Sequence, residues 1–267
     1  MDSVHQARGL LIDMDGVLWR GRTFLPGVQN FFAALRSRNV PFLLVTNNAT
    51  ASPDSAVERL AGAGVAIEPH EVLTSALATA AYLQSVLPQG ASVYAIGEEA
   101  VRSALQDAGF QLQDGHDSAQ AVVVGFDREI SWYKMTQAAL AIQAGALFVG
   151  TNPDVSFPIE GGQAPGNGAF VLAIEAATSA KPVIVGKPEP LLFQQAVERL
   201  GLKPEQTLML GDRLETDILG AQRAGIASAL LLTGVTSIEQ IDGSGIEPDF
   251  IFEDLNALTA ALQAGLN

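Results

Sequence analysis

Strand-like and helix-like segments alternate along this chain of 267 residues from one end to the other. An apolar run at 10–12 comes first, apolar residues then recur at helical spacing over 28–35, and a second apolar run follows at 41–45. Ser52 and Pro53 are typical of an N-cap and a first helical position, and glycines follow that helix. This alternation predicts an α/β fold built on a parallel sheet.

The last third of the chain repeats the same alternation. A helical stripe at 193–200 precedes a strand-like run at 207–212, and a further helix is expected over 215–225. A strand at 227–234, an edge strand at 248–252 and a closing helix from Leu255 complete the series. These segments extend the sheet that the first part of the chain begins.

The middle of the chain has strands enough for a sheet of its own. Apolar runs at 92–97, 121–126 and 146–150 alternate with helical patterns, and many of the loops are rich in glycine and proline, including the one expected at 158–169. We therefore predict a discontinuous Rossmann-like core domain of residues 1–80 plus 184–267, with an inserted α/β domain of residues 81–183. The segment "APGNGAF" (164–170) is interpreted as a tight turn at the domain boundary.

Composition excludes several classes of protein. No apolar run approaches the roughly 20 residues that a membrane span needs, and the first residues do not resemble a signal peptide. The net charge of −14 argues against binding to nucleic acid or to an anionic membrane, since both are polyanions. Without cysteine, disulfides and thiolate chemistry are excluded. We expect a soluble, cytoplasmic protein.

Four polar motifs follow buried-looking segments or connect them. They are "DMDG" (13–16), "TNN" (46–48), "GKP" (186–188) and "GDRLETD" (211–217). In parallel α/β sheets, ligands bind beyond the carboxyl ends of the strands, where three of these motifs are expected to lie. The motifs are therefore predicted to converge on one site.

The first motif sets two carboxylates one residue apart at the end of a buried strand. Asp13 and Asp15 repel one another when ionised, and burial raises the cost of ionising either. A divalent cation there would offset the repulsion, and Asp13 with Asp212 offers the hard oxygen ligands that Mg²⁺ prefers. Thr46 supplies a hydroxyl and Lys187 a point charge for phosphate oxygens. Together these groups indicate a site that handles a phosphate.

Each motif alone has an ordinary structural explanation. "DMDG" could be an exposed turn, "TNN" a cap or turn, and "GKP" a loop. "GDRLETD" could be a helix N-terminus whose acids favour the helix dipole, with Asp217 as a cap residue. Their joint occurrence in this order favours the catalytic interpretation.

The four motifs, with an insert of about 100 residues before the lysine, resemble the haloacid-dehalogenase superfamily. More narrowly, the chain resembles the NagD/p-nitrophenyl-phosphatase branch, whose α/β cap is inserted between the second and third motifs. The resemblance implies that Asp13 is the nucleophile and a Mg²⁺ ligand. It implies that Asp15 is the general acid/base and that its backbone carbonyl also reaches the metal.

The same resemblance assigns the remaining motif residues. Thr46 and Asn47 bind the phosphoryl group, and Lys187 steadies the nucleophile and the phosphate. Asp212 ligates Mg²⁺, and Asp217 supports the metal site from further out. All four motifs are intact in this chain.

The implied activity is Mg²⁺-dependent hydrolysis of a small phosphate monoester through an aspartyl-phosphate. Relatives with this type of cap act on sugar phosphates, nucleoside monophosphates, phosphoglycolate, pyridoxal phosphate and the artificial p-nitrophenyl phosphate. The acid at Asp15 separates this chain from the dehalogenases and the ion-pumping ATPases of the superfamily. A phosphomutase or phosphotransferase stays open, as does a non-enzymatic phospho-acceptor or phosphate sensor, although a sensor would gain lifetime by lacking Asp15. The resemblance is also compatible with a homodimer.

Two loops of the inserted domain carry candidate substrate contacts. Asp127, Arg128 and Trp132 lie in "GFDREISWYK" (125–134), and Asn152 and Asp154 lie in "TNPD" (151–154). A plain surface loop explains the first segment equally well, and turn formation explains the second nearly as well as substrate contact does. Trp19, which follows the first motif on an apolar stretch, is interpreted as a core residue, and the scattered histidines predict no zinc site.

Overall fold

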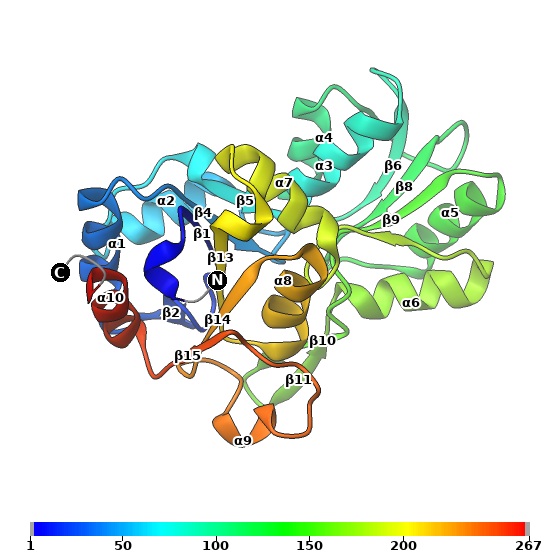
Figure 1. Cartoon of the computed structure of the whole chain (residues 1–267). Helices are drawn as coiled ribbons and strands as arrows, with labels where there is room; N and C mark the ends of the chain where they lie inside the picture. The colour runs from blue at the N-terminus through cyan, green and yellow to red at the C-terminus, as the bar shows by residue number, and fades with distance from the viewer. Residues whose placement is uncertain (1–2, 265–267) are drawn as a thin grey trace. The chain divides into compact units, whose positions relative to one another are not determined.

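The computed structural model describes residues 3–264 (Figure 1), and these form two compact units. The first unit holds the described residues up to Thr46, then Pro53–Leu73, and those from Lys187 onward. The second unit holds Asn47–Ser52 and Thr74–Gly186. The chain therefore leaves the first unit and returns to it.

A six-stranded sheet forms the centre of the first unit, in the order β15–β14–β13–β1–β4–β5. Five of its strands are parallel: β1, β4, β13, β14 and β15. Its strands are β1 (Gly9–Ile12), β4 (Phe42–Thr46), β5 (Val72–Thr74), β13 (Thr207–Gly211), β14 (Ala227–Leu231) and β15 (Phe250–Phe252). The central strands β1, β4 and β13 are buried along their whole length, as expected where helices cover both faces.

Helices cover this sheet on both sides. They are α1 (Val28–Ser37), α2 (Pro53–Ala61), α7 (Pro190–Leu200), α8 (Leu219–Ala224), the short α9 (Ile238–Ile241) and α10 (Leu255–Ala264). Apolar residues of α1, α2 and α10 pack with alternate residues of β1, such as Leu10 and Ile12, in one buried cluster. Helices α7 and α8 pack against one another, and α7 also contacts β4. A small hairpin of β2 (Trp19–Arg20) and β3 (Thr23–Phe24) follows β1.

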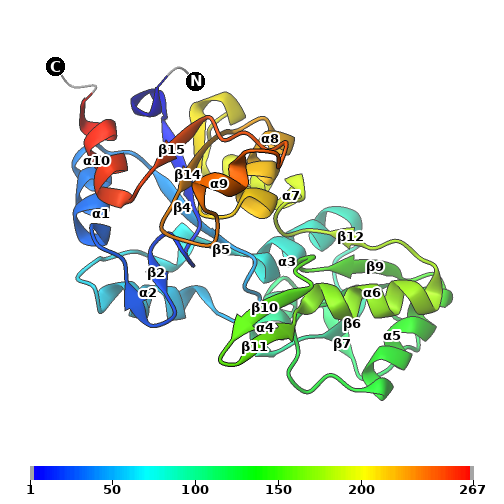
Figure 2. The ribbon, with the colours of Figure 1, turned by 90° about the horizontal axis from the view of Figure 1, so that it is seen from below.

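The second unit is built on a parallel sheet of five strands in the order β12–β9–β8–β6–β7. The strands are β6 (Ser92–Ile96), β7 (Gln111–Gln113), β8 (Ala121–Val124), β9 (Leu147–Gly150) and β12 (Val183–Ile184). Its helices are α3 (Ser75–Val86), α4 (Glu99–Asp107), α5 (Trp132–Gln143) and α6 (Asn167–Thr178). Helices α5 and α6 lie side by side (Figure 2) and share one apolar cluster with β6 and β8.

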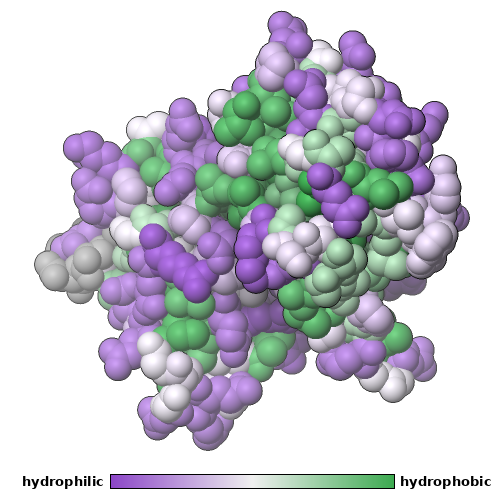
Figure 3. Space-filling view, turned by 90° about the vertical axis from the view of Figure 1, so that its right-hand side faces the viewer, coloured by the Kyte–Doolittle hydropathy of each residue, from purple (hydrophilic) through white to green (hydrophobic). Residues whose placement is uncertain are grey.

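Several large apolar side chains of the second unit are exposed. They come from α5, from the segment that includes β10 (Ser156–Ile159) and from α6: Trp132, Tyr133, Leu140, Val155, Phe157, Ile159 and Leu172. Figure 3 shows apolar residues gathered among polar ones on a face of the molecule. The homodimer expected from the sequence stays a prediction.

The predicted α/β fold with parallel sheets is confirmed. Three details differ from the sequence prediction. The expected helix at 215–225 begins as a π-helical turn, Leu214–Ile218, before α8. The glycine-rich stretch after Pro158, expected as loop, completes a hairpin of β10 and β11 (Gly162–Pro165). The interpretation of 164–170 as a boundary turn is wrong, because this segment lies inside the second unit and starts α6.

The division between the units falls at residues 74 and 186, whereas the sequence suggested 81 and 183. Helix α3 lies wholly in the second unit and packs against α4, which accounts for the earlier start. None of the helices within residues 3–264 combines the length and the apolar character needed to cross a membrane.

Candidate active site

Two aspartates leave the first sheet from neighbouring strands. Asp13 follows β1 directly, and Asp212 follows β13 directly. Ile12 pairs with Leu210 in the sheet, and the Asp13 N–H donates to the Leu210 carbonyl at 2.9 Å. The parallel register therefore delivers both carboxylates to the same edge of the sheet, as the motifs predicted.

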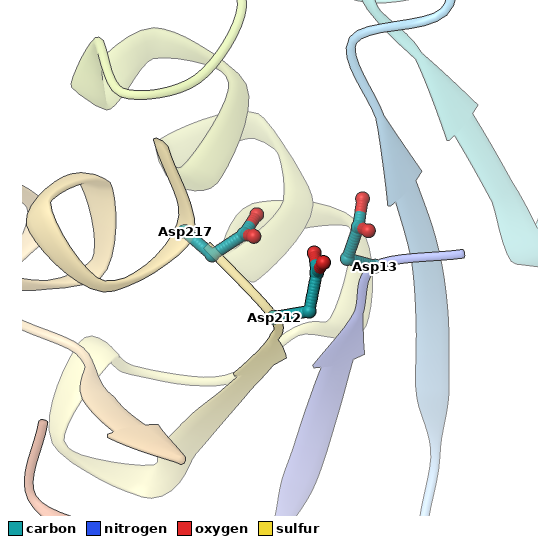
Figure 4. A group of neighbouring side chains, drawn as sticks. All are labelled: Asp13, Asp212 and Asp217. Carbon is teal, nitrogen blue, oxygen red and sulfur yellow. The ribbon is translucent and has the colours of Figure 1, made fainter. Parts of the chain in front are cut away.

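A third aspartate joins them from the turn that follows Asp212. Asp217 lies in the π-helical turn Leu214–Ile218, and Figure 4 shows its carboxylate pointing toward those of Asp13 and Asp212. Ligand oxygens of the three residues all lie within 4.8 Å of one another. The three residues are buried, with exposed fractions of 7%, 4% and 1% for Asp13, Asp212 and Asp217. The sequence alternative of Asp217 as a simple helix cap does not describe this buried position.

One buried lysine serves two of these carboxylates. The Lys187 Nζ donates to Asp13 Oδ1 at 2.5 Å and to Asp217 Oδ1 at 2.6 Å. The second oxygen of Asp217, Oδ2, accepts from the Arg213 N–H at 3.2 Å. Asp217 thus holds the ammonium of Lys187 against Asp13, while its own carboxylate is fixed by the turn.

Three buried carboxylates lie near a single ammonium group, and the pKa values of Asp13, Asp212 and Lys187 reflect this imbalance. Burial raises the pKa of Asp13 well above its ordinary value; Lys187 opposes this shift, and the charges of Asp217 and Asp212 add to it. Burial, followed by the charge of Asp217, raises the pKa of Asp212 to about 6. Burial alone would lower the pKa of Lys187, but Asp13 and Asp217 raise it. Negative charge therefore exceeds positive charge inside this cluster.

Glycines make room for the Asp212 carboxylate on two sides. A Cβ added at Gly16 would lie 2.2 Å from Asp212 Oδ2, and one added at Gly234 would lie 1.7 Å from the same oxygen. Gly16 also has a φ of +86°, a conformation that glycine adopts without strain. The Val235 N–H donates to Asp212 Oδ2 at 2.7 Å. The loop after β14 therefore fixes one oxygen of Asp212.

Asp15 stands apart from the three buried carboxylates. Its side chain is exposed, and its Oδ1 accepts a hydrogen bond from the indole Nε1 of Trp19 at 2.9 Å. Trp19 is 3% exposed and belongs to the apolar cluster, so its interpretation as a core residue is confirmed. The bond to Asp15 was not predicted.

The second motif divides between the units. Thr46 ends β4 in the first unit and is buried, whereas Asn47 belongs to the second unit. There the Asn47 side chain donates to Asp154 Oδ2 at 3.1 Å, and its carbonyl accepts from Asn152 Nδ2 at 2.8 Å. Ser75 Oγ donates to the same carbonyl at 2.8 Å. The structure thus joins Asn152 and Asp154, predicted as substrate contacts, to the residue that follows Thr46 in the chain.

The other predicted contacts of the second unit lie around the loop after β8. Asp127 is buried; its Oδ2 accepts from Lys134 Nζ and its Oδ1 from the Glu129 N–H, both at 2.8 Å. Arg128 pairs with both oxygens of Glu98 at 2.5 and 2.8 Å. Both residues line a cavity of about 630 Å³ in this unit. Trp132 is 77% exposed and is not among the residues that line it.

The acidic cluster has the donor chemistry of a magnesium site. Mg²⁺ is bound through a small number of carboxylate oxygens together with water, and Asp13, Asp212 and Asp217 present such oxygens within reach of one another. The raised pKa values of Asp13 and Asp212 show that a further positive charge would stabilise their ionised forms. The residues present therefore fit a divalent cation.

Comparison of the sequence with known families shows to which family the chain belongs. Residues 10–111 match the family described as haloacid dehalogenase-like hydrolase, and residues 184–258 match the HAD-hydrolase-like family. An acid sugar phosphatase of Staphylococcus aureus is 37% identical over 97% of this chain and 100% of that protein. The chain belongs to the haloacid dehalogenase-like hydrolases.

Solved structures narrow the placement. The p-nitrophenyl phosphatase from Archaeoglobus fulgidus superposes with a TM-score of 0.91 at 33% identity, over 96% of this chain and 99% of that one. NagD from the E. coli K-12 strain gives a TM-score of 0.86 at 32% identity, over 93% and 97% of the two chains. The predicted NagD/p-nitrophenyl-phosphatase branch is confirmed, and with it a phosphatase enzyme.

Sequence reasoning missed three features of this site. Gly234 and Val235, which shape the place of Asp212, follow β14 and carry no recognisable motif. Trp19 was identified only as core, although its position four residues after Asp15 was visible. Arg59, whose guanidinium lies 3.9 Å from the Trp19 ring centroid, comes from α2 and could not be paired with Trp19 from spacing.

Proposed function

We propose that this phosphatase hydrolyses a small phosphate monoester with Asp13 as nucleophile, in a Mg²⁺-dependent reaction through an aspartyl-phosphate. The observation that carries the proposal is the buried cluster of three carboxylates around one lysine at the carboxyl edge of the first sheet. The names of the acid sugar phosphatase and p-nitrophenyl phosphatase relatives support the substrate class. Sugar phosphates are accordingly the first esters to test.

In the proposed reaction an oxygen of Asp13 attacks phosphorus in line with the leaving oxygen. Lys187 holds Asp13 Oδ1 through its ammonium and thereby fixes the carboxylate for attack. Asp15 gives a proton to the departing oxygen and later takes one from the water that cleaves the aspartyl-phosphate. Thr46, at the end of the adjacent strand β4, is the proposed hydroxyl donor to the phosphoryl oxygens.

Asp13 and Asp212 are the proposed carboxylate ligands of Mg²⁺, with the Asp15 carbonyl as a further ligand. When bound, the cation would neutralise charge on the phosphoryl oxygens and on the carboxylates. Asp217 is proposed to act through Lys187, since its oxygens accept from Lys187 and from the Arg213 N–H. Asn47 is proposed to contribute to phosphate binding next to Thr46.

We identify the first unit with the core domain and the second unit with the inserted cap of this branch. Both have the parallel α/β sheets that this assignment requires. The substrate contacts expected from Asp127, Arg128, Trp132, Asn152 and Asp154 stay predictions, as do a cytoplasmic location and a homodimer.

Phosphate release from a panel of sugar phosphates, nucleoside monophosphates and p-nitrophenyl phosphate tests the proposal. The panel is run with Mg²⁺ and with EDTA, on the wild-type protein and on Asp13→Asn. Metal-dependent release that disappears in Asp13→Asn supports the proposal. An isomeric ester in place of free phosphate would indicate a mutase, and release that persists in EDTA would contradict the role of Mg²⁺.

A further inference from the structure

The loop that carries Asp15 folds back on itself and brings Trp19 against it. The Gly16 N–H donates to the Trp19 carbonyl at 2.7 Å, and the Trp19 N–H donates to the Met14 carbonyl at 3.3 Å. Within this loop the Trp19 indole N–H donates to Asp15 Oδ1 at 2.9 Å. The carboxylate of Asp15 is therefore held by a rigid, buried aromatic side chain, although Asp15 itself is exposed.

Trp19 is in turn contacted by two further side chains, Phe24 and Arg59. The Phe24 ring packs edge-on against it, with centroids 6.0 Å apart, across the β2–β3 hairpin. The Arg59 guanidinium lies over the indole ring, 3.9 Å from the ring centroid, and donates to the Gly21 carbonyl at the tip of the same hairpin. A guanidinium over an indole face is attracted by the ring quadrupole, and the hydrogen bond from the same guanidinium to Gly21 further restricts its position. Helix α2 thus clamps the hairpin through Arg59.

We propose that Trp19 is a positioning residue for the acid/base step, and that Arg59 keeps Trp19 in place. The inference rests on the proposed function, in which Asp15 transfers the proton. An indole N–H is a donor only, so the Asp15 oxygen that accepts from it is Oδ1 and the oxygen left to carry the transferable proton is Oδ2. Trp19 therefore decides which oxygen of Asp15 faces the reaction.

The two half-reactions then use the same oxygen. Asp13 attacks phosphorus, the bond to the leaving oxygen breaks, and its electron pair takes the proton from Asp15 Oδ2. Water next attacks the phosphorus of phospho-Asp13, gives a proton to Asp15 Oδ2, and the bond between phosphorus and Asp13 breaks. The alcohol and inorganic phosphate are released, and both aspartates return to their starting states.

Esters with different leaving groups separate this role from a merely structural one. An alkyl phosphate such as glycerol phosphate needs its leaving oxygen protonated, whereas p-nitrophenolate departs without a proton. Trp19→Phe keeps an aromatic ring but removes the N–H. We expect its kcat/KM to fall about tenfold more on the alkyl ester than on p-nitrophenyl phosphate. Arg59→Met should shift the same ratio in the same direction, and the matched control Arg22→Met, an exposed cation on the same hairpin, should not.

A double-mutant cycle tests whether Trp19 acts through Asp15 or only supports the fold. In an Asp15→Asn background, Trp19→Phe should change the ratio between the two esters no further. Equal losses on both esters, or a full further loss in the Asp15→Asn background, would overturn the inference. Failure of all variants and of the wild type on every ester would instead contradict the proposed function.

The hydrogen bond can also be observed without turnover. The chain has two tryptophans, so ¹H–¹⁵N spectra of the protein contain two indole N–H signals. Asp15→Asn should move the signal of Trp19 and leave that of the exposed Trp132 in place. An unchanged Trp19 signal in the folded variant would contradict the bond on which the inference depends.

Discussion

The two parallel sheets differ in how the acidic side chains near their carboxyl edges are balanced by cations. At the first sheet, Asp13, Asp212 and Asp217 are buried around one Lys187. In the second unit, ion pairs are formed one to one, as in Lys134 with Asp127 and Arg128 with Glu98. Their cations are more exposed, at 35% of the Lys134 side chain and 67% of that of Arg128, against 3% for Lys187.

This difference in charge balance indicates which of the two parallel α/β sheets carries the reacting groups. A buried excess of carboxylate is costly unless a cation joins it, so a fold retains it where a cation and a reacting anion are handled. Balanced pairs at a loop can hold the loop in shape without a further ligand. The proposed reaction is accordingly assigned to the edge with unbalanced charge.

The largest expected effect comes from removing the proposed nucleophile at the first sheet and comparing it with the same change in the second unit. Asp13→Asn should lower kcat by about a thousandfold or more with the fold retained, since no other group replaces the attacking oxygen. Asp127→Asn, the equivalent change at the buried aspartate of the second unit, should cost less than tenfold. Steady-state rates and circular dichroism measure both effects. More than a tenth of the wild-type rate in Asp13→Asn would rule out its role.

The two lysines provide a matched test of stability. Lys187→Met leaves two buried carboxylates without their shared ammonium and should lower the free energy of unfolding by about 3 kcal/mol when Mg²⁺ is absent. Lys134→Met breaks a partly exposed pair and should cost less than about 1 kcal/mol. Urea unfolding in EDTA measures both. Equal costs at the two lysines would remove the distinction between the two edges.

The space around Asp212 gives a third test. A methyl group at Gly234 would meet Asp212 Oδ2 at 1.7 Å, so Gly234→Ala must displace this carboxylate. We expect the Mg²⁺ concentration for half-maximal activity to rise about tenfold. The added methyl group of Gly115→Ala, in the second unit, meets only the end of the Gln137 side chain at 3.3 Å. This control should leave the Mg²⁺ concentration for half-maximal activity unchanged. An unaltered Mg²⁺ requirement in Gly234→Ala would count against Asp212 as a ligand.

The smallest expected effect is on the free energy of unfolding and comes from the ion pair of Arg36 and Glu71 in the first unit. Burial alone would raise the pKa of Glu71, but hydrogen bonds from Arg36 and the Glu68 N–H, with the charges of Arg36 and His70, lower it overall. A carboxyl whose pKa is lowered by folding stabilises the fold above its unfolded pKa, near 4.3, and loses this contribution as the pH falls through its folded pKa.

The comparison of wild type with Glu71→Gln measures this contribution. The wild type should be more stable at pH 7 by no more than about 1 kcal/mol, because the Arg36 side chain is 48% exposed. The difference should shrink as the pH drops below about 4.3, because Glu71 is then protonated first in the unfolded chain and, at lower pH, in the folded protein. A difference that grows toward acid would show the opposite shift in pKa.

Much of the fold and the main site could be predicted from the sequence. Apolar runs such as 41–45 are long enough to indicate buried strands. Asp13 and Asp212 come directly after two further strand-like runs and therefore had to reach one edge of a parallel sheet. The hairpin of β10 and β11 was missed because its residues, apart from the half-buried Ala164, are exposed and lack an alternating apolar pattern.

Contacts made by residues outside the four motifs could not be predicted. Val235 reaches Asp212 and Arg59 reaches Trp19 through tertiary packing, for which spacing along one element gives no signal. The engagement of Asn47 with Asp154, 107 residues later, is of the same kind. The motifs identified the reacting groups, and the fold supplied the groups that orient them.

The central claim, that Asp13 is phosphorylated at the edge of the first sheet, is tested most directly by trapping the intermediate. Asp15→Asn removes the group that activates water, while the p-nitrophenolate leaving group departs from p-nitrophenyl phosphate without an acid. With Mg²⁺ present, this variant should release a burst of p-nitrophenolate close to one equivalent and carry one phosphoryl group on the peptide that contains Asp13, as read by mass spectrometry. A burst without phosphate on Asp13, or phosphate on another residue, would contradict the account.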